Sequence, residues 1–267
     1  METDITAPLS ALSHPGRLEV FRLLMRRYPQ SVRAGEIAQA LDTRPSTVSA
    51  YLAALMQAGL ITQRRESTTL LYRAALGPLR AMVGEFLETS CAGRVDLVPP
   101  AAQFPQARRL GLLFIGQGNA ARSLMAEALL RARGADRFHA YSAGVAPAEA
   151  PSPHALDVLR AHGVEAGRLV PRGLAEFVDR AAVQIDIVIT LSDAAATALR
   201  GPWPGGPVRS HWGLADPARA EGTGAERRGV FEAAFEQIEG RIAKLAALPV
   251  GTFGRGALQQ ALDEIGA

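Results

Sequence analysis

The stretch LGLLFIGQGNAARSLMAEALLRAR, which spans residues 110–133, decides the fold of the second half of the chain. Its first six residues, Leu110–Ile115, form an apolar run of the length typical of a buried strand. A glycine-rich loop follows at once, and a helix is expected from Leu124 to about Arg133. Strand, tight loop and helix N-terminus in this order make an anion site, because backbone N–H groups point inward and the helix dipole favours negative charge.

The loop supplies the candidate ligand-binding residues. Arg122 can donate two parallel hydrogen bonds to an oxyanion, and Asn119 tolerates the left-handed backbone that such a tight loop needs. A glycine-rich loop alone is a weak signal, and a plain tight turn without a ligand fits the same letters equally well. The predicted oxyanion-binding residues of the loop are Gly116, Gln117, Gly118, Asn119, Ala120, Ala121, Arg122 and Ser123.

Later segments continue the alternation of apolar strands and helices that is typical of a parallel α/β sheet. Together with the opening stretch they resemble, in order, the low-molecular-weight tyrosine phosphatases and the thioredoxin-coupled arsenate reductases; the segments are Tyr141–Val145 (YSAGV), His154–Gly163 (HALDVLRAHG), Ile185–Leu191 (IDIVITL) and His211–Pro217 (HWGLADP). The resemblance spans about residues 108–248 and implies an α/β fold with a parallel sheet. It gives Asp216 the position of the catalytic Asp of those enzymes and adds it to the predicted oxyanion site. The tyrosine phosphatases have aromatic residues directly after this Asp-Pro pair, whereas Ala218-Arg219-Ala220 follow here, which favours a small ligand over phosphotyrosine.

The sequence departs from this family at the position of the catalytic nucleophile. The family attacks phosphorus or arsenic with a thiolate at the first loop position, six residues before the arginine, and this position is Gly116. The reductases also need cysteines after the third strand, where this sequence has Ser192, and Cys91 is the only cysteine of the chain. The sequence therefore predicts a cradle that binds an oxyanion and is not an enzyme. The alternative is a hydrolase that needs no cysteine and uses Asp216 to activate water.

The first part of the chain has helical apolar spacing and one predicted strand pair. Helices are expected at Ala34–Leu41 and from Pro45 through Ala58, with a short turn between them, and Gly59 ends the second helix. Strands are expected at Leu60–Arg65 and Thr69–Arg73. Two helices joined by such a turn match helix-turn-helix geometry, in which the second helix enters the major groove of DNA. The alternative is a helical bundle whose polar face is only solvated.

Short hydroxyl side chains and one aromatic residue lie at the start of the predicted recognition helix, and arginines lie on the predicted wing. Hydroxyl groups suit base edges and phosphates, and arginines neutralise phosphates. The predicted DNA-binding residues are Arg44, Ser46, Thr47, Ser49, Ala50, Tyr51, Arg64, Arg65 and Arg73.

Three segments of this region resemble the ArsR-type winged-helix repressors across about residues 8–91: SHPGRLEVFRLL (13–24), EIAQALDTRPSTVSAYLAALMQAGLITQRRES (36–67) and LLYRA (70–74). The family implies a homodimer built from its first and last helices, here about Thr6–Leu12 and Ala75–Ser90, on a palindromic operator. Members that sense arsenic or metals carry cysteines or His/Asp clusters on the recognition helix or the last helix. Cys91 stands alone here, so we expect no metal site and no cofactor.

The order of these motifs predicts two domains. They are an ArsR-type winged-helix domain at residues 1–94 and a phosphatase-like domain at residues 109–248, joined by a proline-rich linker at 95–108 and followed by a tail with a loop and a short helix at 249–267. The formal net charge is only +3, so nucleic-acid contacts depend on the placement of charge. No apolar run is long enough to span a membrane, and the N-terminus lacks the basic segment of a signal peptide. We therefore expect a cytoplasmic protein without membrane contact.

These patterns together predict a dimeric transcriptional repressor whose second domain senses a small oxyanion or phosphorylated ligand. Its expected partners are double-stranded operator DNA, the ligand and a second copy of the chain. The alternative is a constitutive DNA binder whose second domain serves only dimerisation or docking.

Overall fold

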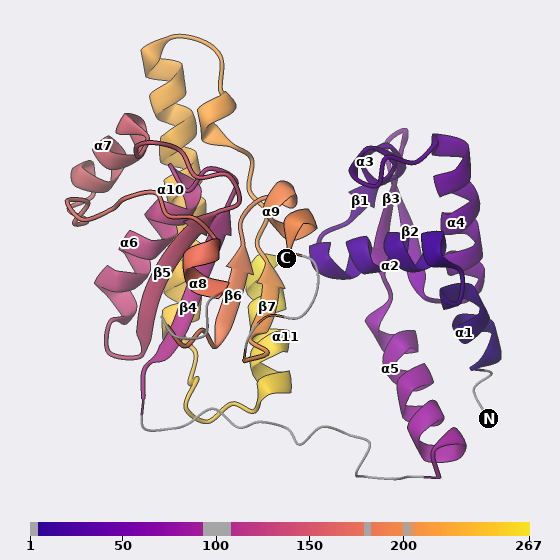
Figure 1. The fold of residues 1–267 in the computed structure, drawn as a ribbon. Helices are drawn as coiled ribbons and strands as arrows, with labels where there is room; N and C mark the ends of the chain where they lie inside the picture. The colour runs from indigo at the N-terminus through magenta and orange to yellow at the C-terminus, as the bar shows by residue number, and fades with distance from the viewer. Residues whose placement is uncertain (1–4, 93–107, 179–182, 200–202, 204) are drawn as a thin grey trace. The chain divides into compact units, whose positions relative to one another are not determined.

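The computed structural model of the chain describes residues 5–92, 108–178, 183–199, 203 and 205–267 (Figure 1). The chain forms two compact units, Met1–Ala101 and Ala102–Ala267. The boundary between them falls inside the predicted linker at residues 95–108, which lies outside the described residues except for Arg108.

The first unit is a winged helix-turn-helix. Its helices are α1 (Thr6–Leu12), α2 (Pro15–Arg27), α3 (Ala34–Ala40), α4 (Pro45–Gln57) and α5 (Leu76–Glu85), the last continuing as the π-helical turn η1 (Phe86–Ser90). Its strands β1 (Val32–Arg33), β2 (Ile61–Glu66) and β3 (Thr69–Ala74) form an antiparallel sheet in the order β1-β3-β2. All the helices and both wing strands expected from the sequence are present, with ends within a residue or two of their expected positions.

Local sequence signals explain where these elements begin and end. His14 caps α2, because its Nδ1 accepts hydrogen bonds from the backbone N–H groups of Gly16 and Arg17 at 3.1 and 3.4 Å. Pro45 opens α4, where a helix needs no N–H donor. Gly59 follows α4 with a φ of +69°, a left-handed conformation that glycine adopts without steric cost.

The second unit is an α/β domain with a parallel sheet, as expected. Its strands are β4 (Leu110–Gly116), β5 (Phe138–Gly144), β6 (Ile187–Thr190) and β7 (Val208–His211), in the order β5-β4-β6-β7. Its helices are α6 (Arg122–Gly134), α7 (Pro153–Ala161), α8 (Ala175–Val178), α9 (Asp193–Ala198), the 3-10 turn η3 (Pro217–Arg219), α10 (Gly224–Ala247) and α11 (Arg255–Gly266). Every described strand pair of this four-stranded sheet is parallel.

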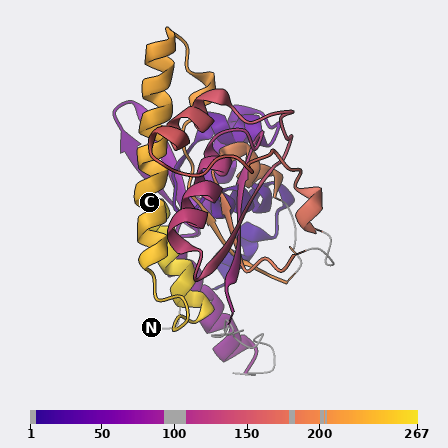
Figure 2. The same ribbon diagram turned by 90° about the vertical axis from the view of Figure 1, so that its left-hand side faces the viewer.

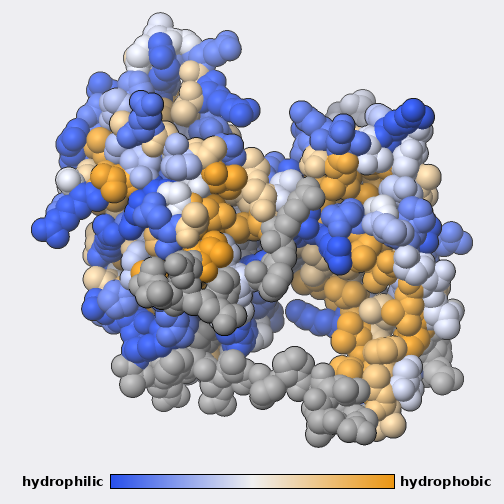
Figure 3. All heavy atoms as spheres, in the orientation of Figure 1, coloured by the Kyte–Doolittle hydropathy of each residue, from blue (hydrophilic) through white to orange (hydrophobic). Residues whose placement is uncertain are grey.

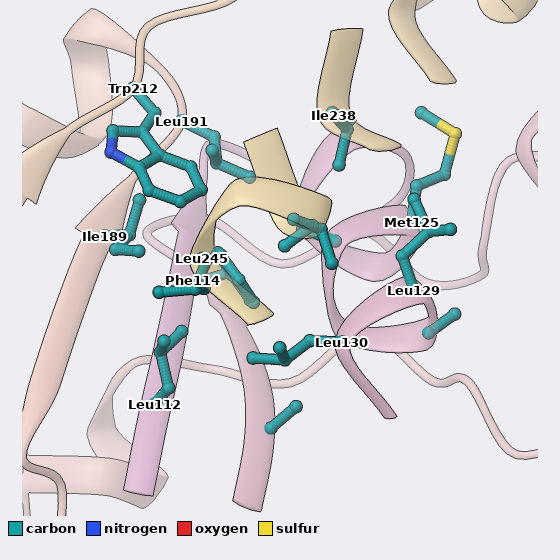
Figure 4. Packing of buried hydrophobic residues seen from close by; sticks show 14 of the residues in the cluster. Leu112, Phe114, Met125, Leu129, Leu130, Ile189, Leu191, Trp212, Ile238 and Leu245 are labelled. Carbon is teal, nitrogen blue, oxygen red and sulfur yellow. The ribbon is translucent and has the colours of Figure 1, made fainter. Parts of the chain in front are cut away.

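Helices cover both faces of this sheet (Figure 2). Side chains of α6, α7, α10 and α11 form one large apolar cluster with Leu112 and Phe114 of β4. Figure 4 shows part of this cluster, including Met125 of α6 and Ile238 of α10. Phe177 of α8 and Ala195 of α9 pack with Leu113 on the other face. Because α6 lies between the sheet and α10, its residues from Arg122 to Leu130 are all buried. The helix that begins at the candidate anion site is therefore shielded from water along most of its length.

The segment predicted as a separate tail belongs to the second unit. Leu258 and Leu262 of α11 are fully buried in the main core, and the indole N–H of Trp212 donates to the Leu262 carbonyl at 2.9 Å. Arg241 holds the same corner by donating to the carbonyls of Trp212 and Gly266. The loop and the short helix expected at residues 249–267 are present. They do not form a separate tail, because the apolar face of α11 packs against β7 and completes the core.

No helix in the described part of the chain is long and apolar enough to cross a membrane.

Candidate functional site

The carboxyl ends of the four parallel strands bring the predicted site together. In the order β5-β4-β6-β7, the connection after β4 leads to β5 on one side of it, and the connection after β5 returns past β4 to β6 on the other side. Crevices for ligands form at such a switch point. The loop after β4 begins at Gly116, whose register partner on β5 is Gly144. Ser192 follows β6, and Asp216 lies beyond the end of β7. The topology therefore gathers residues far apart in the sequence at one edge of the sheet.

The backbone of the loop points its carbonyl groups away from the candidate ligand position. The carbonyls of Gly116, Gln117, Gly118 and Ala120 accept hydrogen bonds from the N–H groups of Val145, Ala146, Ala148 and Ser152, at 3.2, 2.9, 2.8 and 2.8 Å. In a planar trans peptide the N–H of the next residue points opposite to the carbonyl. Among the described residues, the N–H groups of residues 117–123 have no acceptor within the chain. The loop is thus a nest of donors at the N-terminus of α6, the arrangement that suits an anion.

Asn119 braces the loop from inside. It is buried, with a φ of +49°, the left-handed conformation expected from the sequence. Its Nδ2 donates to the hydroxyls of Ser123 and Ser142 at 3.0 and 2.7 Å, and its Oδ1 accepts from the backbone N–H of Arg172 at 2.7 Å. The amide therefore holds the loop, α6, β5 and the segment before α8 together.

A buried carboxylate that was not predicted from the sequence contacts Ser142 and Arg172, two of the residues that bind the Asn119 side chain. Glu127 is 1% exposed, accepts the Ser142 hydroxyl and forms ion pairs with Arg131 and Arg172. Arg172 contacts both carboxylate oxygens, at 2.8 and 2.9 Å. A carboxylate on the apolar side of a helix, four residues before an arginine, is a signal for Glu127. No pattern in the sequence indicates Arg172.

Arg122 lies in the site together with the Asp216 loop. Its Nη1 donates to the Leu214 carbonyl at 2.6 Å, and its Nη2 pairs with Oδ2 of Asp216 at 2.9 Å. The side chains of Arg122 and Asp216 are 9% and 27% exposed. Burial lowers the pKa of Arg122 below its ordinary value, while the nearby carboxylate of Asp216 acts in the opposite direction. Arginine stays charged even so, and its N–H bonds that face neither Leu214 nor Asp216 remain available to an anion.

Gly116 is the last residue of β4 and lies beneath the loop. A Cβ added there would lie 2.9 Å from the Ser123 hydroxyl oxygen. Ser192, after β6, accepts a hydrogen bond from the backbone N–H of Ala195 at 3.2 Å and so caps α9. Cys91 lies in the first unit, at the end of the turn that follows α5. In the described part of the chain, no three side chains of His, Cys, Asp and Glu gather where they could hold a metal ion.

Most of the predicted DNA-binding residues lie on the surface of the first unit. Ser46, Ser49 and Ala50 are exposed on α4, and Arg44 is exposed just before it. The Ser49 hydroxyl donates to the Pro45 carbonyl at 3.0 Å. The remaining predicted residues are Thr47, which is half-buried on α4, and Arg64, Arg65 and Arg73, which are exposed on β2 and β3. The structure therefore gives α4 one exposed polar face and gives the wing a set of exposed arginines.

Tyr51 occupies a different position from the other predicted residues of α4. Its ring packs on His14, with ring centroids 5.1 Å apart, and a Cβ at Gly16 would lie 2.6 Å from the ring. The ring thus helps to join α4 to α2.

Comparisons with known proteins found a matching family model for each of the two units. Residues 14–63 match the family model described as "Bacterial regulatory protein, arsR family", and residues 111–252 match the model "Low molecular weight phosphotyrosine protein phosphatase". An arsenate reductase of Halalkalibacterium halodurans is 32% identical over 136 residues, which are 51% of this chain and 94% of that protein. The biofilm growth-associated repressor of Agrobacterium fabrum is 30% identical over 95 residues, 36% of this chain and 79% of that protein.

Among solved structures, an arsenate reductase from Archaeoglobus fulgidus is similar with 27% sequence identity and a TM-score of 0.40, over 51% of this chain and 99% of that one. The family model of the phosphatases covers more than half of the chain. The chain therefore belongs to the low molecular weight phosphotyrosine protein phosphatase family, and it carries an ArsR-family helix-turn-helix in front of that domain.

Proposed function

We propose that the chain is a dimeric DNA-binding repressor whose phosphatase-like domain binds a small oxyanion and does not transform it. The observation that carries the proposal is the loop at residues 116–123. It presents a nest of unpartnered N–H groups and a buried Arg122, but a glycine at its first position.

The donors of the loop suit a tetrahedral anion. Oriented backbone N–H groups at the start of a buried helix, with one guanidinium beside them, favour phosphate-like groups over neutral ligands. Several relatives are named arsenate reductases, and arsenate has the shape and charge of phosphate. We therefore propose inorganic phosphate or arsenate as the first ligands to test.

The absence of a thiol at the loop argues against turnover. Covalent catalysis in such a cradle needs a nucleophile beneath the anion, and Gly116 has no side chain. The single thiol, Cys91, belongs to the other compact unit. A thiolate would add a negative charge beneath the ligand, so a cradle without one repels an anion less.

The proposal of a dimer rests on the surface of the first unit. Of the large apolar side chains that remain exposed, Leu9 lies on α1, Val83 on α5 and Phe86 on η1 (Figure 3 shows apolar residues along α5). Two copies joined through these helices would present two α4 helices to a palindromic operator.

Substitutions in each unit separate the two binding activities. We expect phosphate and arsenate to raise the melting temperature of the wild-type protein and to change its affinity for a DNA duplex selected from a random pool. Arg122→Lys should lose both responses, because lysine cannot reproduce the guanidinium fork, while retaining DNA binding. Arg64→Ala, together with Ser49→Ala, should weaken DNA binding and retain the thermal shift. Arg160→Ala, an exposed arginine on α7, is the matched control and should change neither property.

Three results would contradict the proposal. A DNA affinity that ignores both anions would favour a constitutive DNA binder. Unchanged DNA binding in the Arg64 and Ser49 variants would argue against the α4 and wing surface. Hydrolysis of an aryl phosphate by the wild type that disappears in Asp216→Asn would make the domain an enzyme.

A further inference from the structure

The cradle contains two hydrogen-bond acceptors beside its one buried cation. The Leu214 carbonyl and Oδ2 of Asp216 both contact the guanidinium of Arg122, at 2.6 and 2.9 Å. The second carboxylate oxygen of Asp216 accepts from the Ala218 N–H at 3.2 Å, which fixes the side chain in place. Any anion held by Arg122 and the loop N–H groups therefore lies next to a carboxylate.

The charge of the cradle is already balanced before a ligand enters. Asp216 neutralises Arg122 as an ion pair. The other charged groups close enough to act on Arg122 are Asp193, which follows β6, and Arg219, which follows the Asp-Pro pair. His211 of β7 is buried, with its Nδ1 at 2.7 Å from the Thr190 hydroxyl and its Nε2 at 3.2 Å from Asp193. Arg122 and Arg219 are positive and Asp216 and Asp193 are negative, so the formal charges of these four groups sum to zero and supply no net positive charge for a doubly charged ligand.

We propose that the cradle selects a tetrahedral oxyanion in its protonated, singly charged form, and that Asp216 is the residue that selects it; this inference rests on the proposed oxyanion binding. Dihydrogen phosphate or dihydrogen arsenate accepts hydrogen bonds from the loop and from Arg122, and donates its own O–H groups to Asp216 and to the Leu214 carbonyl. Sulfate carries no proton at neutral pH. It would place an oxygen lone pair against each acceptor, so that the two oxygens repel each other and no hydrogen bond forms between ligand and acceptor.

Competition between phosphate and sulfate tests the role of Asp216 in the full chain. At pH 6.5 we expect the wild type to bind phosphate at least about 100-fold more tightly than sulfate, because a site built around a ligand hydroxyl rejects analogues that lack it by large factors. Asp216→Asn should reduce this ratio to below about tenfold by raising the affinity for sulfate, since an amide can donate to it. Asp193→Asn is the matched control: it removes a negative charge near Arg122 and keeps the Asp216 acceptor, so it should lower the ratio far less than Asp216→Asn does.

The pH dependence of the wild type gives a second test that needs no variant. Phosphate affinity should fall as the pH rises from 6 to 8.5, because inorganic phosphate loses its second proton in this range and becomes a dianion. Sulfate does not titrate there, so sulfate binding to the wild type over the same pH range serves as the baseline for any change in the protein itself.

The outcomes distinguish this inference from the function on which it rests. If the wild type binds neither anion, both are wrong. If it binds phosphate and sulfate equally, or if Asp216→Asn leaves the ratio unchanged or Asp193→Asn lowers it as much, the cradle binds oxyanions but Asp216 does not select among them. Should Asp216→Asn not fold, the pH series on the wild type decides: phosphate affinity that is constant or rises with pH overturns the inference.

Discussion

Two glycines lie against the anion loop, and they tolerate a side chain to different degrees. A Cβ at Gly144 would lie 2.9 Å from the Asn119 nitrogen and the Gln117 oxygen and 3.0 Å from the Gly118 carbonyl carbon, all of which are backbone atoms. At Gly116, the one close contact of an added Cβ would be the Ser123 hydroxyl oxygen at 2.9 Å, since the next atoms, the Ser123 Cβ and the Asn119 nitrogen, lie at 3.5 and 3.9 Å. The loop can move away from a methyl group at Gly144 only as a whole, whereas a single side chain can turn away at Gly116.

We therefore expect Gly144→Ala to cost about 2–3 kcal/mol of unfolding free energy and Gly116→Ala about 1 kcal/mol, on the scale of overpacked cores. In a unit of this size each kcal/mol lowers the melting temperature by about 2–4 °C. Gly240→Ala is the control: it lies inside α10 with open space around it, so it should stabilise the protein slightly. Equal losses for Gly144→Ala and Gly116→Ala would show that the loop backbone yields as easily as a serine side chain.

The residues of the candidate site differ in how far the sequence indicates them. Arg122 and Asn119 sit in a loop whose spacing is distinctive, and Asp216 follows a recognisable segment, so all three could be chosen in advance. The pairing of Arg122 with Asp216 and Leu214 could not, because 92 residues separate Arg122 from Leu214 and no local rule sets that approach. Arg172 was missed for the same reason, since its contact with Glu127 spans 45 residues.

At the scale of elements, the start of α10 carries a charge-dependent cap. The Thr223 hydroxyl accepts from the Glu226 N–H at 3.3 Å, and the Glu226 carboxylate accepts from the Thr223 N–H at 2.7 Å. Hydrogen bonds from the backbone and from the hydroxyl of Thr223 lower the pKa of Glu226 below its ordinary value of 4.5. A lowered pKa means that the folded state favours the carboxylate. The contribution to stability is therefore present above the unfolded-state value and is lost as the pH falls through the folded-state value.

Replacing the carboxylate of Glu226 should reveal how the stability contribution of this cap depends on pH. We expect Glu226→Gln to lower the melting temperature at pH 7, and the difference from the wild type to shrink as the pH falls below about 4.5, where the wild-type carboxylate takes up its proton. Thermal unfolding followed by circular dichroism between pH 3 and 7 measures it. Glu236→Gln, at an exposed position farther along the same helix, controls for the loss of one charge. An equal pH profile in both variants would mean that the cap contributes nothing specific.

Periodicity and caps predicted the elements well where one apolar face was strong. The start of α4 at Pro45 agrees with the sequence prediction, and α1 agrees with the first helix that the ArsR resemblance implied at Thr6–Leu12. By contrast, α6 begins at Arg122, two residues before the expected Leu124. The apolar spacing starts at Leu124, but the first turn is fixed by the loop geometry. The burial of α11 could not be inferred from its own residues, because an amphipathic helix does not reveal which surface it covers.

At the scale of the whole molecule, the proposed dimer rests on apolar side chains that a single first unit leaves exposed. Val83 is 45% exposed on α5, and Phe86 lies close by on η1. A carboxylate at either position would have to lose water on association. We expect Val83→Asp combined with Phe86→Asp to weaken dimerisation at least tenfold in sedimentation equilibrium, and DNA affinity with it.

Val230→Asp is the matched control, because this valine is 41% exposed on α10 of the other unit. It should leave both properties unchanged. The double variant should also keep the thermal shift with phosphate. A dimer that survives in the double variant but breaks in Val230→Asp would place the interface on the phosphatase-like unit instead.

The burial of Arg122 has a consequence for ionic strength. Mobile ions screen charges that face water and act far less on charges enclosed by protein. The arginines of the wing are exposed, and DNA binding of this kind falls steeply as salt is added. Phosphate held at the N-terminus of the enclosed helix α6 should respond weakly to sodium chloride. A high-salt buffer would therefore release the DNA and leave the anion bound, so that the two ligands of one chain can be studied one at a time without changing a residue.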